Sequence, residues 1–218
     1  MEVSTYDRIQ KFALVVGRVA LAYLFFTQLF WKFPPSFGCP ADYSFTTGTV
    51  ESGRVRLDRT SGLCDWIGIE TVWAEQPRPF FVADMRPING PVLSVDLGWF
   101  ARLNSSFLES FMQPNIRWAG WLVWGGEAFI FASLLLGVFS RLGGLTAILI
   151  SGQLMIGLAG ISNPYEWEWS YILMVVLSFV MLAFAPGRVF GLDARLRPSL
   201  HSAAQNGSRL AKFLLALT

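Results

Sequence analysis

The chain alternates between long apolar stretches and polar connections. Four stretches reach the length that a membrane helix needs, at residues 12–33, 118–139, 142–161 and 169–185, the last being the shortest. About 20 helical residues cover the ~30 Å hydrocarbon layer of a bilayer, and a backbone exposed to lipid must satisfy its own hydrogen bonds. The pattern therefore predicts an all-α integral membrane protein, built as a bundle of four transmembrane helices.

These spans divide the chain into four parts. Residues 1–33 hold the N-terminal segment and the first span, residues 118–187 hold the other three spans, and residues 188–218 form a tail. Residues 34–117 form a long insertion, which is unusual for a small helical membrane protein. The apolar stretch at 12–33 is too long for the core of a cleaved signal, and no small-residue cleavage site follows it, so we expect a retained helix.

The insertion carries signals for small strands. Residues 45–50 and 54–59 flank a turn at 51–53, and the second segment alternates in character, which predicts a β-hairpin. Residues 69–74 (IETVWA) and 79–84 (PFFVAD) are interpreted as further strands.

The end of the insertion predicts an amphipathic helix. Apolar residues recur near helical spacing until Pro114 stops the pattern. Such a helix is typical of segments that lie on a membrane surface. We expect its apolar face to cap the bundle, and the alternative is a site for a partner. The residues of this face are Trp99, Leu103, Phe107, Leu108 and Phe111.

Charge placement predicts the orientation. Bases gather before the first span, in the turn after the second and in the tail, whereas the connection at 162–169 has two acids and no base. By the positive-inside rule both termini are cytoplasmic and the insertion is extracytoplasmic, in an inner or plasma membrane that the chain crosses several times. The bases are Arg8, Lys11, Arg141, Arg188, Arg195, Arg197, Arg209 and Lys212. Tryptophans at the predicted outer ends agree with an interfacial belt, namely Trp31, Trp118, Trp121, Trp124, Trp167 and Trp169.

Composition narrows the class of protein. The chain is 53% hydrophobic, its mean hydropathy is +0.46 and its formal net charge is only +2, which favours membrane lipid as a partner and argues against nucleic acid. The single histidine, His201, lies in the tail and is expected to be solvated. Because the sequence lacks a cluster of Cys and His residues, we expect no haem or metal on this chain. It also lacks the glycine-rich motifs of a phosphate-binding loop. Any electron carrier is then organic and diffusible, or belongs to another subunit.

Both cysteines, Cys39 and Cys64, fall in the insertion. In an oxidising compartment, two cysteines without a third favour a structural disulfide. The alternative is a redox-active pair, although the spacing is not C-x-x-C and no base lies nearby in the sequence.

The most informative single residue is Glu127, in the middle of the second span. A charged carboxylate at that depth costs at least about 2.5 kcal/mol, so Glu127 has to be protonated, paired or facing a wet cavity. One interpretation is a structural hydrogen bond between helices. The other is a catalytic group that handles protons or orients a ligand in a small-molecule site.

Residues at the predicted outer ends of the spans suggest a binding pocket beside Glu127. Lys32 ends the first span and Arg117 begins the second. Together with Trp121 and Trp124 they would form an aromatic-walled pocket with cationic donors. Such a pocket suits an anion, or a quinone whose carbonyl oxygens need donors and whose ring needs stacking. The alternative is that the basic side chains simply reach for the interface.

Three segments together resemble the DoxX/DoxD family. In the second span, GEAFIFASLLLGVFSRLGG carries an acid, small residues and a G-x-x-x-R ending, here Glu127, Gly137 and Arg141. The first span, GRVALAYLFFTQLFWKF, matches through Arg18 and Lys32. The resemblance covers all four spans but not residues 38–103. After the fourth span, APGRVFGLD matches the ending G-P-G-R-x-S-L-D through Pro186, Gly187, Arg188, Leu192 and Asp193.

The connection NPYEWEW and the chain length look most like the DoxD branch, the membrane subunit of thiosulfate:quinone oxidoreductases. This resemblance implies oxidation of two thiosulfates to tetrathionate on the outer side, with the electrons passed to quinone and a second subunit as a partner. A function of a different class stays open. The chain is then a non-catalytic subunit that braces a larger respiratory or photosynthetic complex through its insertion.

Four residues at the predicted inner end are expected to be structural. Arg18 is expected to reach for the interface. A turn after residues 186–187 would let Asp193 fold back onto Arg141 or Arg188, as an ion pair that closes the bundle to cytoplasmic water. The alternative is anchoring by positive charge alone, in which Asp193 is incidental.

Overall fold

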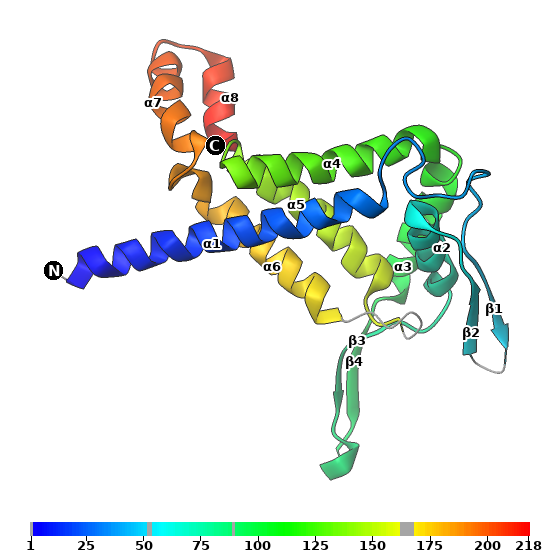
Figure 1. The fold of residues 1–218 in the computed structure, drawn as a ribbon. Helices are drawn as coiled ribbons and strands as arrows, with labels where there is room; N and C mark the ends of the chain where they lie inside the picture. Colours follow the sequence, from blue (N-terminus) through cyan, green and yellow to red (C-terminus); the bar gives the residue numbers. More distant parts are fainter. Residues whose placement is uncertain (1, 52–53, 89, 162–167) are drawn as a thin grey trace. The chain divides into compact units, whose positions relative to one another are not determined.

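The computed structural model describes residues 2–51, 54–88, 90–161 and 168–218 (Figure 1). Within these ranges, three helices are long and apolar enough to cross a membrane: α1 (Glu2–Trp31), α4 (Ile116–Leu136) and α5 (Ser140–Leu158). Helix α6 (Glu168–Phe184) occupies the place of the fourth predicted span, but its apolar part is shorter, Ser170–Phe184. The chain is therefore a helical protein with several candidate spans. Most of the acidic connection at 162–169, Trp167 included, lies outside the described residues.

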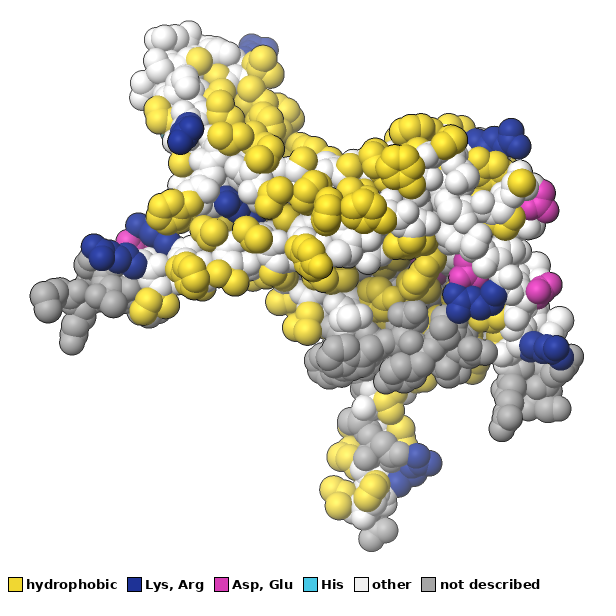
Figure 2. Space-filling view, viewed as in Figure 1, with side chains coloured by type: hydrophobic (Ala, Val, Ile, Leu, Met, Phe, Trp, Pro, Cys, Tyr) yellow, Lys and Arg dark blue, Asp and Glu magenta, His cyan; other side chains and the backbone are white. Residues whose placement is uncertain are grey.

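The candidate spans carry apolar side chains on their exposed sides as well as in their core. Figure 2 shows hydrophobic side chains along α1 and α4. On α1 the exposed ones recur every three or four residues, so one whole side of the helix is apolar. A surface of this kind is unfavourable in water and fits contact with lipid. Its residues on α1 include Phe12, Val16, Val19 and Tyr23.

The described chain divides into two compact units. The first comprises Met1–Phe30, Gly125–Ile150 and Leu173–Thr218. Its apolar core draws on α1, α4, α5 and α6, with Leu21, Phe25, Ile130, Leu134, Ala147 and Met181 buried together. After α6, a 3-10 turn at Pro186–Arg188 leads into α7 (Leu192–Gln205) and α8 (Arg209–Leu217), which lie side by side as a helical hairpin (Figure 1).

The second unit comprises Trp31–Trp124 and Ser151–Ile172. Strands β1 (Thr47–Glu51) and β2 (Arg54–Asp58) pair in antiparallel fashion, with Val50 opposite Val55. This confirms the hairpin predicted at 45–59. A second antiparallel hairpin joins β3 (Pro79–Asp84) to β4 (Val92–Asp96) and confirms the strand predicted at 79–84.

The strand predicted at 69–74 is wrong, because these residues end helix α2 (Gly62–Ala74). Local β propensity from Ile69, Val72 and Trp73 suggested a strand, but the tertiary setting overrides it. Leu63, Cys64 and Ile67 of α2 are buried in one core cluster and Ile69 and Trp73 in another. As a helix, the segment places these side chains in two cores while its backbone groups hydrogen-bond within the helix.

The predicted amphipathic helix is present as α3 (Gly98–Phe107), which continues into a π-helical turn at Leu108–Met112. The side that packs inward is small and polar, with Gly98, Ala101 and Ser105 buried, and of the predicted apolar face only Leu108 is buried. The large hydrophobic side chains of α3 that are exposed are Trp99, Phe100, Leu103 and Phe107. The expectation that this face caps the bundle stays a prediction.

Candidate functional site

A buried carboxyl group lies at the centre of the second unit. Glu70 of α2 is only 4% exposed. Its Oε2 atom accepts a hydrogen bond from Asn104 Nδ2 of α3 at 2.8 Å and another from Gln153 Nε2 of α5 at 2.6 Å. Two side-chain amides from two further helices thus converge on one carboxyl oxygen. The sequence offers one signal for this residue: an acid in the most apolar part of the insertion.

The surroundings of Glu70 favour its protonated form. Burial raises the pKa of Glu70 to about 8, against an ordinary value of 4.5. The two amide hydrogen bonds and the positive charge of Arg78 lower this pKa, but they do not offset the loss of solvation. At neutral pH the group is therefore mostly a neutral acid that can release its proton within a physiological range.

Arg78 holds the end of the neighbouring helix in place. Its guanidinium is 1% exposed and donates hydrogen bonds to the carbonyl oxygens of Ile156 at 3.1 Å, Gly157 at 3.0 Å and Ala159 at 2.5 Å. A helix leaves its last carbonyl groups unpaired, and a cation there also suits the helix dipole. Burial lowers the pKa of Arg78 to about 10, so it stays charged at neutral pH.

The packing around Glu70 leaves no room for a larger residue at Gly157. A Cβ atom added there would lie 2.2 Å from the Glu70 carboxyl carbon. The cluster of Glu70, Arg78, Asn104, Gln153 and Gly157, called the Glu70 cluster below, is therefore a closed, hydrogen-bonded group that joins α2, α3 and the end of α5. Sequence reasoning missed the four polar residues of this cluster.

The residues predicted to form the ligand pocket are divided between the two units. Glu127 lies in the first unit, in α4, and is 1% exposed, which agrees with a carboxyl group deep in a span. Lys32, Arg117, Trp121 and Trp124 lie in the second unit. The combined pocket thus stays a prediction.

Within the second unit, the predicted aromatic and basic residues contact one another in part. The rings of Trp121 and Trp124 meet edge to face, with centroids 6.2 Å apart. The ammonium of Lys32 lies 4.6 Å from the ring centroid of Trp31, and the guanidinium of the exposed Arg117 lies 4.9 Å from that of Tyr43. Both cations therefore rest on aromatic faces, as cation–π pairs do. The expectation that Arg117 reaches for the membrane interface stays a prediction.

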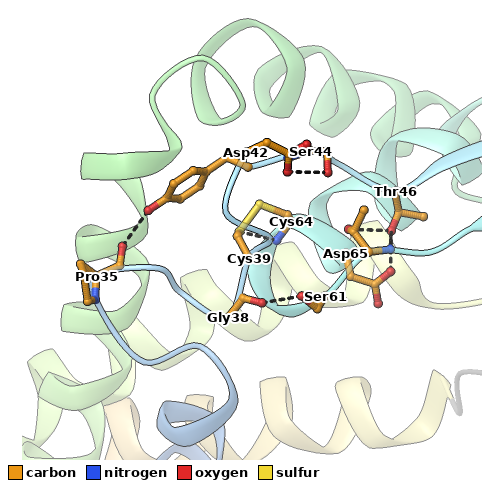
Figure 3. Close-up of a disulfide and its surroundings, with 11 residues drawn as sticks. Pro35, Gly38, Cys39, Asp42, Ser44, Thr46, Ser61, Cys64 and Asp65 are labelled. Atoms are coloured by element: carbon orange, nitrogen blue, oxygen red, sulfur yellow. Dashed lines mark hydrogen bonds between the residues drawn. A yellow bond between two sulfur atoms is a disulfide. The ribbon is translucent and has the colours of Figure 1, made fainter.

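Cys39 and Cys64 form the predicted disulfide (Figure 3). The bridge ties the segment after α1 to the start of α2, where Ser61 Oγ also donates to the Gly38 carbonyl oxygen at 2.7 Å. Both half-cystines are buried in the apolar cluster that includes Phe37 and Ile67. These surroundings support the structural interpretation over the redox-active one.

A second buried polar group, in the first unit, gathers residues that were predicted to be structural. Asp193 is fully buried. Its carboxylate accepts hydrogen bonds from the Phe139 N–H at 2.7 Å and from the Ser140 N–H and hydroxyl at 3.0 and 2.7 Å. Asp193 therefore does fold back onto the turn between α4 and α5, but the partners described are these donors rather than the guanidinium of Arg141 or Arg188.

Arg18 completes this cluster, and the expectation that it reaches for the membrane interface stays a prediction. Arg18 is 3% exposed and donates to the carbonyl oxygens of Pro186 at 3.3 Å and Phe190 at 3.1 Å. Gly137 makes room for it, because a Cβ there would lie 2.2 Å from the Arg18 Nη1 atom, and the residue also has a positive φ of 64°.

The other two predicted inner residues lie close to this cluster. Burial first, and then the positive charges of Arg197 and Arg141, lower the pKa of Arg188. Arg188 donates to the Thr218 carbonyl oxygen at 2.6 Å, and Arg197 donates to the same oxygen at 3.2 Å. Arg188 thus fastens α8 to the turn before α7.

In comparisons with known proteins, no family model matches the chain, and no curated protein or solved structure matches it. The resemblance to the DoxX/DoxD family therefore stays a prediction.

Proposed function

We propose that this chain is the membrane subunit of a quinone-linked oxidoreductase, with Glu127 as its proton-handling group. The observation that carries the proposal is the burial of Glu127, at 1% exposure, within an apolar helix of membrane-spanning length. Because an acidic side chain within a membrane span costs free energy, its presence there favours a functional role over simple packing. In this proposal α6 is a fourth span, both termini are cytoplasmic, and the second unit's insertion lies outside.

The resemblance to the DoxX/DoxD family motivates the proposed reaction. Two thiosulfate ions lose one electron each as their outer sulfur atoms join in the S–S bond of tetrathionate. One quinone takes up these two electrons and two protons to become quinol. Glu127 of the first unit would handle the protons that quinone reduction takes up. In the second unit, Lys32 and Arg117 would attract the anion or donate to a quinone carbonyl, and Trp121 and Trp124 would stack on a quinone ring.

The test compares two variants of the purified chain with its co-purified partners. Glu127→Gln keeps the size of the side chain and removes its acid, so thiosulfate-dependent reduction of a soluble quinone should be lost while the melting temperature stays close to that of the wild type. Glu75→Gln changes an exposed acid of the second unit and should leave the rate unchanged. Wild-type protein that shows no such activity, or a fully active Glu127→Gln variant, contradicts the proposal.

A second candidate is a non-catalytic subunit of a larger membrane complex. One observation favours it: every residue of β4 is exposed, and Val92, Leu93 and Val95 are among them. An apolar hairpin open to solvent is typical of a surface that another protein covers. Purification in mild detergent separates the two candidates, because a brace should always co-purify with partner subunits. A chain that migrates alone and turns over quinone contradicts this second function.

A further inference from the structure

The C-terminal hairpin of the first unit has an exposed surface that combines apolar and basic side chains. Phe190, just before α7, is 83% exposed, and Phe213 of α8 is 61% exposed. Leu192, Leu196 and Leu210 are exposed as well. Figure 2 shows hydrophobic side chains gathered along one side of this hairpin, with Lys and Arg side chains near its margins.

The charge of this surface has one sign. Arg195, Arg209 and Lys212 are exposed, whereas the single acid of residues 188–218, Asp193, is fully buried. Arg188 and Arg197 are directed to the carbonyl oxygen of Thr218 and hold the two helices together. The exposed bases are therefore not balanced by an exposed acid of the same hairpin.

The hairpin is also fixed at the end of two candidate spans. The backbone N–H of Asp193 donates to the Gly137 carbonyl oxygen at 2.8 Å, and its carboxylate binds the N–H groups of Phe139 and Ser140. These partners form the turn between α4 and α5. The first turn of α7 thus begins at the turn that joins two candidate spans, so a bilayer crossed by α4 and α5 would have its edge near the start of α7.

We propose that the α7–α8 hairpin lies in the membrane interface and binds anionic lipid headgroups of the leaflet at this end of the spans. Apolar side chains would enter the boundary between headgroups and acyl chains, while Arg195, Arg209 and Lys212 contact phosphates. Amphipathic helices with bases beside an apolar face bind membranes in this way. The continuity of the surface with the spans and its charge select lipid over a protein partner.

The test places a fluorescent reporter on the hairpin of the full chain. Because both native cysteines are in the disulfide, Phe213→Cys introduces a unique thiol for an environment-sensitive label, and Leu210→Cys serves as a second reporter. Gln205→Cys, at an exposed polar position of α7, is the matched control. Each labelled protein is placed in nanodiscs of phosphatidylcholine alone or with phosphatidylglycerol.

The expected result is a blue-shifted emission of the labels at 213 and 210 in the anionic discs, with quenching by lipid-borne nitroxides and reversal at high salt. The label at 205 should keep its aqueous emission. Adding Arg209→Gln and Lys212→Gln should lower the ratio of docked to undocked hairpin roughly 30-fold, since each base near an anionic surface contributes about 1 kcal/mol.

Three results would overturn the proposal. Aqueous emission at 213 and 210 in both disc types means that the hairpin stands in water. Shielded labels that lipid nitroxides do not quench mean that a second copy or another protein covers the surface. Quenching that is equal in both disc types and insensitive to salt and to loss of the bases means that anionic headgroups are not recognised.

Discussion

The Asp193 carboxylate accepts a hydrogen bond of 2.7 Å from the Ser140 hydroxyl, although the two residues are 53 positions apart in the chain. Because it also accepts from the N–H groups of Phe139 and Ser140, Asp193 acts as an N-cap for α5 from a distant part of the sequence. A negative charge at a helix N-terminus suits the helix dipole. One side chain thus joins the start of α7 to the start of α5.

Asp193→Ala should destabilise the protein by about 3–5 kcal/mol, because it strands buried N–H groups and removes the charge that attracts the buried Arg18. Asp193→Asn keeps one acceptor and should lose less. The exposed Glu75→Ala is the control and should change stability by less than about 0.5 kcal/mol. Thermal unfolding in detergent measures all three, and equal midpoints for Asp193→Ala and Glu75→Ala would contradict the capping role.

The Glu70 cluster should make stability depend on pH in a defined direction. The folded-state pKa of about 8 lies above the ordinary 4.5, so between these pH values the folded chain holds a proton that the unfolded chain has released. The free energy of unfolding therefore falls as pH rises, by up to about 1.4 kcal/mol per pH unit, and levels off above the folded-state pKa. The full stability is present below pH 4.5.

Glu70→Gln should remove most of this dependence and raise the melting temperature at pH 8, because the neutral amide still accepts the hydrogen bonds of Asn104 and Gln153. Melting curves from roughly pH 5 to pH 9, on both sides of the folded-state pKa of Glu70 of about 8, compare this variant with the wild type. The Glu75→Gln control should retain the wild-type slope. A wild-type melting temperature that rises with pH over this range would contradict the assignment.

The sequence predicts the candidate spans well, because a long apolar run has few alternatives to a membrane helix. It predicts the β1–β2 hairpin from a similarly local pattern, and the Cys39–Cys64 bridge because the chain has two cysteines and no third. The strand predicted at 69–74 is wrong because local propensity does not include tertiary packing. These residues end helix α2, whose side chains are buried in two separate core clusters.

The two polar clusters could not be predicted, since each depends on contacts between distant segments. Glu70 meets Asn104 and Gln153 across 34 and 83 residues of sequence. For α3, periodicity located the amphipathic helix but not which side packs inward. In a soluble protein the apolar side packs, whereas at a membrane surface the small, polar side can pack and leave the apolar side to lipid.

Removing the disulfide should weaken the second unit alone. Cys39→Ala with Cys64→Ala opens a crosslink between residues 25 positions apart, and loops of this size contribute on the order of 3 kcal/mol. We expect faster amide exchange around residues 36–46 and 61–68, with unchanged exchange in the core of the first unit. Mass mapping of the wild type without reductant should show the linked peptide, and two freely alkylating thiols would contradict the bridge.

Replacing Arg78 should have two separable effects. Arg78→Met keeps an apolar stem but leaves the carbonyl oxygens of Ile156, Gly157 and Ala159 without their donor. Buried carbonyl groups without partners cost about 1–3 kcal/mol each, so the end of α5 should exchange its amides faster. Arg78→Lys should restore little of this protection, because an ammonium lacks the planar fork that reaches several carbonyls.

The second effect of Arg78→Met concerns Glu70. The charge of Arg78 lowers the pKa of Glu70, so its removal should move the titration of Glu70 above the wild-type value of about 8. The pH at which the melting temperature levels off then shifts upward, a result that loss of packing alone would not produce. Arg56→Gln removes an exposed positive charge of the same unit and should leave that pH unchanged. A levelling pH that is the same in Arg78→Met and in wild type would show that Arg78 only caps α5 and does not act on the Glu70 carboxyl.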